Sequence, residues 1–159
     1  MDVYLIENKK TYRENIKIHL KKVMNNVDLN IIEFNDLKQC NKKFNKHKTP
    51  KLIITDLFGN KEELIKPTCK SIYNTIMNIS IPELIKLRKK IGDNFKLMII
   101  SKYHSYLNDD CFEDGKQWAD EIKSILDSKI KPNWVIDKIE LIDKYEEIKD
   151  ALESFREII

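Results

Sequence analysis

Glycine is scarce in this sequence of 159 residues, which contains only Gly59, Gly92 and Gly115. None of the three lies in the first strand-to-helix turn, where the G-x-G-x-x-G loop of a dinucleotide site must stand. A Walker A loop, whose glycines surround nucleotide phosphates, is also missing. These absences argue against the commonest cofactor-dependent enzymes.

Cysteine is equally scarce, and Cys40, Cys69 and Cys111 are far apart, without a C-x-x-C pair. An odd number of widely spaced cysteines is typical of a cytosolic protein, so we expect all three thiols to be reduced. No cysteine pair has the spacing of zinc ligands, and the three histidines are scattered. We therefore predict no zinc site.

Long apolar runs are absent as well, since even Leu97–Ile100 is far too short to span a membrane. Met1–Val3 leads directly into a strand-like pattern, without the basic and apolar regions of a signal peptide. The formal net charge of +3 is too small to indicate nucleic-acid or membrane binding. We expect a cytoplasmic protein whose partners are neither nucleic acid nor membrane.

Five short apolar runs of strand type alternate along the chain with segments of helical periodicity. This alternation predicts a five-stranded parallel sheet covered by helices on both faces, a doubly wound α/β fold formed by residues 1–159 as one domain. The expected strands are 3–6, 29–34, 51–55, 95–101 and 133–138, and the expected helices are 10–24, 35–47, 80–91, 113–128 and 143–159.

Two connections depart from the regular alternation. The segment 57–79, after the third strand, is expected to be an insertion with room for a short helix at 68–77. A capping box at Ser80–Glu83 predicts that a separate helix begins there, and Gly92 is expected to end it. The polar segment 102–110 is expected to be a loop.

Polar side chains stand where the predicted strands end. In open α/β sheets, ligands bind at the carboxyl ends of the strands. These residues are therefore expected to share one rim of the sheet: Glu7 and Asn8 after the first strand, Asp56 after the third, Ser101 after the fourth, and Asp137 and Lys138 at the end of the fifth.

This order of residues resembles the receiver domain of two-component response regulators over nearly the whole chain. Asp56, in Leu-Ile-Ile-Thr-Asp-Leu, resembles the phosphoacceptor aspartate of that family. Ser101, in Met-Ile-Ile-Ser, resembles its switch hydroxyl, and Lys138 its invariant lysine. Glu7–Asn8 stands at the position of its acidic pair. Lys131–Pro132 is an alternative to Lys138, but it would leave the strand-like run after it unexplained.

The resemblance implies a flavodoxin-like fold and a signalling role. It implies that Asp56 accepts a phosphoryl group and that Glu7, Asn8 and Asp56 hold a magnesium ion. Lys138 would pair with the phosphoryl oxygens. Ser101 would hydrogen-bond to the new phosphate and so bias the loops after the third and fourth strands. A stand-alone signalling domain, rather than a turnover enzyme, would contact a protein partner such as a histidine kinase or a homodimer mate.

Four positions differ from the family pattern. Glu7–Asn8 replaces a pair that usually holds at least one aspartate, and Ile139 replaces the proline after the lysine. Lys102 stands where a small residue follows the switch hydroxyl, and Val135 stands at the switch aromatic. A second version of the hypothesis is therefore a pseudo-receiver, an interaction module that works without phosphorylation.

A rival hypothesis is a small enzyme that uses the same rim. Glu7, Asp56 and His104 would supply its catalytic groups, and the 57–79 segment would be a lid, since long insertions in α/β domains are often functional. A hydrolytic pair of His104 and Ser105 is a weaker form of this idea, because the sequence has no G-x-S-x-G elbow.

Overall fold

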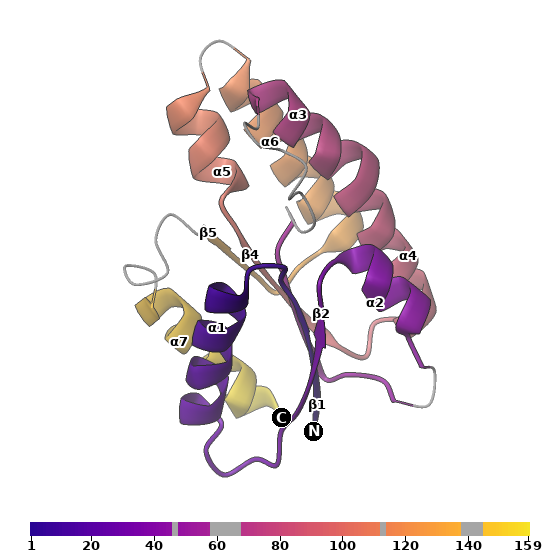
Figure 1. Ribbon diagram of the computed structural model, residues 1–159, viewed down its shortest axis with the longest axis vertical. Coiled ribbons are helices and arrows are strands. Elements are labelled where there is room, and N and C mark those ends of the chain that lie inside the picture. Colours follow the sequence, from indigo (N-terminus) through magenta and orange to yellow (C-terminus); the bar gives the residue numbers. More distant parts are fainter. Residues whose placement is uncertain (46–47, 58–67, 112–113, 138–144) are drawn as a thin grey trace.

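The computed structural model describes residues 1–45, 48–57, 68–111, 114–137 and 145–159. A parallel five-stranded sheet with the strand order β2-β1-β3-β4-β5 forms its centre (Figure 1). This is the flavodoxin-like order, so the predicted fold class is confirmed. The strands are β1 (Asp2–Ile6), β2 (Asn30–Phe34), β3 (Leu52–Thr55), β4 (Lys96–Ser101) and β5 (Trp134–Asp137).

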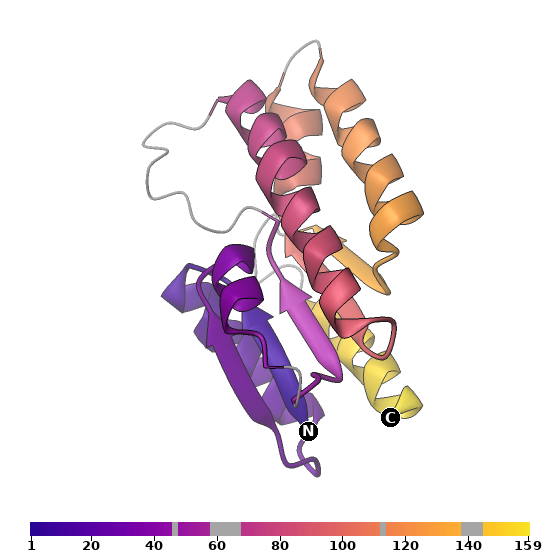
Figure 2. The same ribbon diagram turned by 90° about the vertical axis from the view of Figure 1, so that its right-hand side faces the viewer.

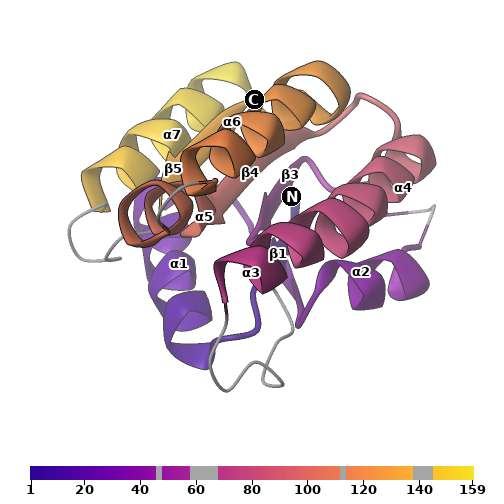
Figure 3. The ribbon, with the colours of Figure 1, turned by 90° about the horizontal axis from the view of Figure 1, so that it is seen from above.

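The sheet is covered on both faces, because its central strands are apolar on both sides. On one face pack α1 (Lys10–Val23) and α7 (Tyr145–Ile158), and on the other pack α2 (Leu37–Lys43), α4 (Ile81–Ile91) and α6 (Gly115–Ile125) (Figure 3). All four residues of β3 are buried, as a strand enclosed by two helical layers requires. No helix within the described ranges is long and apolar enough to cross a membrane.

The helix after β3 is longer than predicted. It starts with α3 (Cys69–Thr75), continues through the π-helical turn η1 (Ile76–Ser80) and ends with α4 at Gly92, as expected. The predicted new start at Ser80 is wrong, because Ser80 is helical and its hydroxyl donates to the carbonyl of Leu57 instead of capping a helix. The wide turn, where the Ile81 N–H bonds to Ile76 O, precedes Pro82 and accommodates its missing N–H.

The crossover from β4 to β5 also contains more helix than predicted. Most of the segment 102–110, expected to be a loop, is helical: it forms α5 (Tyr103–Ser105) and the π-helical turn η2 (Tyr106–Asp110). After α6 the chain continues through η3 (Leu126–Ile130) and leaves the helix at Lys131, which has a left-handed φ of 52°. Together α3, α5, η2 and α6 form a helical extension that rises beyond the carboxyl ends of the strands (Figures 1 and 2).

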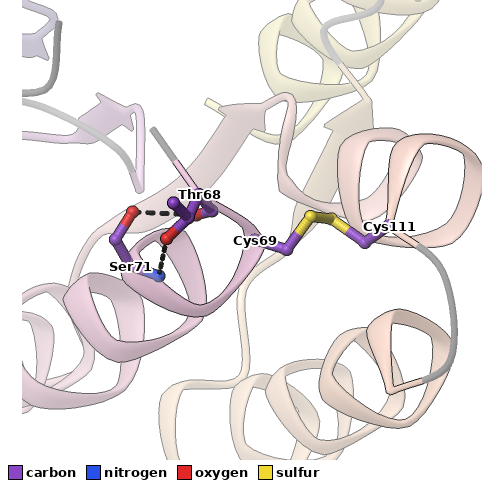
Figure 4. The surroundings of a disulfide bond; sticks show 4 residues. All are labelled: Thr68, Cys69, Ser71 and Cys111. Carbon is purple, nitrogen blue, oxygen red and sulfur yellow. Dashed lines mark hydrogen bonds between the residues drawn. A yellow bond between two sulfur atoms is a disulfide. The ribbon is translucent and has the colours of Figure 1, made fainter. Parts of the chain in front are cut away.

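The expectation of three reduced thiols is wrong for two of them. Cys69 and Cys111 form a disulfide between the start of α3 and the residue after η2 (Figure 4). Their separation of 42 residues gives no pairing signal in the sequence, and only the fold brings the two Cα atoms to 5.9 Å. The inference of a reducing compartment from cysteine spacing therefore loses its basis.

Cys40 is the free cysteine, and it lies fully buried beside α4. Burial raises the pKa of its thiol to about 12. Such a thiol stays protonated at neutral pH, so a structural role suits it better than a chemical one.

Both ends of the chain lie at the amino edge of the sheet, opposite the rim (Figures 1 and 2). Met1, Ile158 and Ile159 line a groove of about 540 Å³ there, together with Lys51, Lys96 and Phe155.

Reduction of the disulfide should lower the stability of the protein. Closing a loop of this length stabilises a chain by about 4 kcal/mol in the chain-entropy account. We expect dithiothreitol to lower the melting temperature by roughly 10 °C. Differential scanning calorimetry of the Cys69→Ser/Cys111→Ser variant should give the lower value with or without reductant, while Cys40→Ser should respond like the parent. An unchanged melting temperature after verified reduction would contradict this account.

Candidate functional site

Asp56 lies at the centre of the carboxyl edge, directly after β3. Its N–H donates to the carbonyl of Ile6 (3.0 Å), so the pairing with β1 continues one residue past Thr55. The hydroxyl of Thr55 donates to the Asp56 carbonyl (2.9 Å) and helps to hold the end of the strand. Asp56 is only 9% exposed. The predicted position of this carboxylate at a strand end is therefore confirmed.

Glu7 follows β1 at the position next to Asp56 in the strand register. Because Ile6 pairs with Thr55, the next residues of the two strands, Glu7 and Asp56, stand side by side. Glu7 is 2% exposed, and its Oε1 accepts a hydrogen bond from the Lys9 N–H (3.0 Å). Asn8 follows and is half-buried. Neighbouring strands thus deliver two buried carboxylates and one amide to one place.

Ser101 is the last residue of β4, on the other side of β3. It is 1% exposed, and its register partner on β5 is Asp137. The Ser101 hydroxyl accepts a long hydrogen bond from the Tyr103 N–H (3.4 Å), at the point where α5 begins. A buried hydroxyl at this edge fits the predicted position, and α5 follows it without an intervening loop.

The structure tests only one of the two lysines that the sequence offered for phosphate pairing. Lys138 lies outside the described residues, one position after Asp137. The alternative, Lys131, is excluded as a rim residue, because it precedes β5. The N–H of Asn133 donates to Leu97 O (2.8 Å), which places this stretch at the start of β4 and hence at the amino edge. Lys138 therefore stays the sequence candidate.

A groove of about 310 Å³ extends from Ser101 between β5 and α6. Sequence reasoning missed it, because its outer wall belongs to the segment 102–110, for which no helix was predicted. Val135, 47% exposed, stands in it at the position of the family's switch aromatic. The lining residues are Ser101, Tyr103, His104, Lys123, Leu126, Asp127, Val135 and Asp137.

The serine and histidine of α5 do not form a hydrolytic pair. The hydroxyl of Ser105 donates to Asp137 Oδ1 (2.8 Å), which ties α5 to the end of β5. The exposed His104 ring instead lies 3.2 Å from the Asn108 amide nitrogen. Sequence proximity alone suggested the pair, and the turn of the helix sends the two side chains to different partners.

Two ammonium groups approach the rim from different connections. Lys9, which follows Glu7–Asn8, and Lys102, which follows Ser101, both have Nζ near the Tyr12 ring, at 5.3 and 5.7 Å from its centroid. Such cation–π contacts hold long side chains near one another. Because the two lysines follow residues at the ends of β1 and β4, the connections at this edge carry positive as well as negative charge.

The donor set at the rim suits a hard cation. Carboxylate and amide oxygens are ligands that Mg²⁺ accepts, and Mg²⁺ needs few of them because it keeps several waters. Glu7, Asn8 and Asp56 offer such a set, although Glu7 Oε1 already accepts from the Lys9 N–H. Within the described part of the chain, no cluster of three or more His, Cys, Asp or Glu side chains could hold a metal, so any ion would also depend on Asn8 and water.

Comparison with known proteins finds solved structures with the same architecture. No protein-family model matches the sequence, and no curated protein matches it either. Solved structures do match over almost the full length. A signal receiver domain of a histidine kinase from Clostridium thermocellum is 20% identical, with 97% of this chain and 95% of that chain covered and a TM-score of 0.58. The chain has the receiver fold.

Two response regulators share the receiver fold with this chain. The phosphorylated cyanobacterial phytochrome response regulator RcpA is 14% identical, with 99% and 95% of the two chains covered and a TM-score of 0.59. The Mn²⁺-bound response regulator Rcp1 is 15% identical, with 98% and 93% covered and a TM-score of 0.54. The sequence resemblance and the fold therefore agree.

The tie between α5 and β5 can be tested by removing one hydroxyl. Ser105→Ala deprives the Asp137 carboxylate of its donor and should lower the free energy of unfolding by about 1 kcal/mol. Urea denaturation followed by circular dichroism measures this change. Ser124→Ala, at an exposed position of α6, is the matched control and should change stability by less than about 0.5 kcal/mol. Equal effects of the two variants would show that the hydrogen bond contributes nothing.

Proposed function

We propose that this protein is a signalling receiver that accepts a phosphoryl group on Asp56. The observation that carries the proposal is the position of Asp56, buried at the end of the central strand β3 with Glu7 in register on one side. Ser101 ends the strand on the other side. This geometry gives a nucleophile, a second carboxylate and a hydroxyl donor in the order that the receiver resemblance requires.

The reaction transfers a phosphoryl group to a carboxylate oxygen. An Asp56 oxygen attacks phosphorus, the bond from phosphorus to the leaving group breaks, and the leaving group keeps the electron pair and takes a proton from solvent. Nucleophile and donor are both anionic, so the barrier depends on local positive charge. Lys9 and Lys102, whose Nζ atoms lie near the Tyr12 ring, are proposed to supply part of that charge. Lys138 is proposed to pair with the phosphoryl oxygens as a point charge.

A divalent cation, when bound, would neutralise further charge on the phosphoryl oxygens. Glu7, Asn8 and Asp56 are the residues that would hold it, and Mg²⁺ is the proposed ion. The structural neighbour Rcp1 is described with Mn²⁺ bound, which supports divalent-ion binding by a protein of this fold. With one carboxylate contributed by Glu7 and a neutral amide by Asn8, the affinity should be modest.

Ser101 is proposed to respond to phosphorylation by donating a hydrogen bond to the phosphate on Asp56. Its hydroxyl accepts a long hydrogen bond from the Tyr103 N–H, and accepting that bond is compatible with donating its proton to a phosphate oxygen. Movement of Ser101 would be passed to α5 and to the Ser105–Asp137 hydrogen bond. The output is proposed to be contact with a protein partner, and a histidine kinase is the proposed phosphoryl source.

The rival enzyme with Glu7, Asp56 and His104 is less well supported. His104 is exposed and contacts Asn108. The lid assigned to 57–79 includes residues 58–67, outside the described ranges, while its second half is the helix α3 with η1. Within the helical extension, α3 packs against η2 and α6.

Phosphorylation can be measured directly by intact mass. Incubation with Mg²⁺ and acetyl phosphate should add the mass of one phosphoryl group, because Asp56 then has its nucleophilic oxygen and charge neutralisation together. Asp56→Asn keeps the shape and removes the nucleophile, so it should gain no mass. Asp109→Asn, an exposed carboxylate on η2, is the matched control and should be phosphorylated normally.

Two results would reject the phosphoacceptor role. One is no added mass in the parent protein under any divalent ion tested. The other is mass that persists in Asp56→Asn. The first would favour the pseudo-receiver version, in which the fold binds its partner without phosphorylation.

Metal binding has its own measurement, independent of phosphorylation. A tenfold excess of Mg²⁺ over its dissociation constant stabilises the folded chain by about 1.4 kcal/mol. Thermal unfolding with increasing Mg²⁺ should therefore show a rising melting temperature in the parent and in Asp109→Asn. Asp56→Asn and Glu7→Gln should respond much less. An equal rise in melting temperature in all four proteins would show that the ion binds at another site.

A further inference from the structure

The disulfide joins the two segments that follow the rim residues. Cys69 begins α3, in the connection that leaves Asp56, and Cys111 follows η2, in the connection that leaves Ser101. The cross-link therefore spans the β3–β4 and β4–β5 crossovers, with β4 inside the loop that it closes. Figure 4 shows the sulfurs bridging the start of α3 and the end of the neighbouring helix.

The helices around the disulfide pack closely without further covalent support. The rings of Tyr73 on α3 and Trp118 on α6 are stacked with centroids 5.0 Å apart, and the Tyr73 hydroxyl donates to Glu121. Gly115 lets α6 approach η2 directly, since a Cβ there would lie 2.1 Å from the Leu107 carbonyl oxygen. These contacts join α3 and η2 each to α6, so reduction would remove the covalent link between α3 and η2 while both stay packed on α6.

The extension is connected to the rim by a short path. Ser101 accepts from the Tyr103 N–H, and Ser105 donates to Asp137, so both ends of α5 are bonded to the strand ends. From there η2 leads directly to Cys111. A tether at Cys111 thus restrains the segment that must shift if Ser101 moves.

We propose that Cys69 and Cys111 form a reversible redox-modification site whose reactant is a dithiol and whose opening frees the segments after Asp56 and Ser101. The disulfide form holds α3 and η2 together in the arrangement described. The dithiol form lets them move apart. The link from this site to phosphorylation rests on the function proposed above, whereas the tether itself does not.

The chemistry is thiol–disulfide exchange. Cys69 is half-buried and Cys111 is only 7% exposed, so attack is proposed at Cys69 Sγ, on the more exposed residue of the pair. A reductant thiolate attacks it, the S–S bond breaks, and Cys111 leaves with the electron pair and takes a proton. The second thiol of the reductant then attacks the mixed disulfide and releases Cys69, leaving the reductant as a disulfide. Two electrons and two protons reach the protein.

Hydrogen exchange of the full chain tests the tether without any phosphoryl donor. The oxidised protein and the protein reduced by dithiothreitol are compared by mass spectrometry of peptides that cover α3 and η2. We expect exchange in these segments to be at least about fivefold faster after reduction, and exchange in β1 and β3 to be unchanged. Cys40→Ser should respond to reduction like the parent. In Cys69→Ser/Cys111→Ser, the α3 and η2 peptides should exchange at the fast rate with and without dithiothreitol.

Reversibility is tested with glutathione buffers of graded redox ratio. The fraction of disulfide, read by intact mass after alkylation, should rise and fall with the ratio in either direction. Equal exchange in the two forms would overturn the tether. A disulfide that does not re-form after reduction would overturn the redox site.

The same two preparations are then given Mg²⁺ and acetyl phosphate. The reduced form should gain the phosphoryl mass at least about fivefold faster, because Ser101 and α5 are released. Equal rates, or a faster oxidised form, would overturn the link to the rim. If neither form gains mass, the proposed function fails, and the exchange experiment still decides for or against the redox site.

Discussion

The parallel register of the three central strands is the constraint on which the rest depends. Pairing of Ile6 with Thr55 and of Thr55 with Ile99 fixes where each strand ends. Side chains alternate faces along a strand, so a slip by one residue would send every apolar side chain of β3 to the opposite helical layer. Both layers bury apolar residues against this sheet. The packing of the two cores therefore determines that Glu7 and Asp56 stand side by side.

The sequence was informative where burial is complete. The continuous apolar runs of β1, β3 and β4 correctly predicted strands that are buried on both faces. The end of the run in β3 then predicted the position of Asp56. The start of a helix was wrongly predicted at Ser80, because a Ser-x-x-Glu pattern can occur inside a helix as well as at its start. Only the position of the Leu57 carbonyl shows that its hydroxyl is engaged elsewhere. The cysteine pair was hidden for a similar reason, since its 42-residue separation is a property of the fold.

The helical extension stands next to the rim of the sheet (Figure 1). In this chain the connection after Ser101 becomes helical within two residues, and the helix after β3 is one long element that begins beyond the carboxyl ends of the strands. The rim is therefore flanked by helices, and α5 is hydrogen-bonded to the end of β5. In the proposed receiver, partner selectivity would reside in these helices and the phosphoryl chemistry at the strand ends. The two roles are separated in space and can vary independently.

The location of the chain ends has a practical consequence. Met1 and Ile159 line one groove at the amino edge, on the far side of the sheet from Asp56. A protein immobilised on a sensor surface through either end would present Asp56 and the helical extension outward, to the flowing solution. Fluorophores or affinity handles placed there would likewise leave the rim accessible, so binding kinetics could be recorded on an oriented layer.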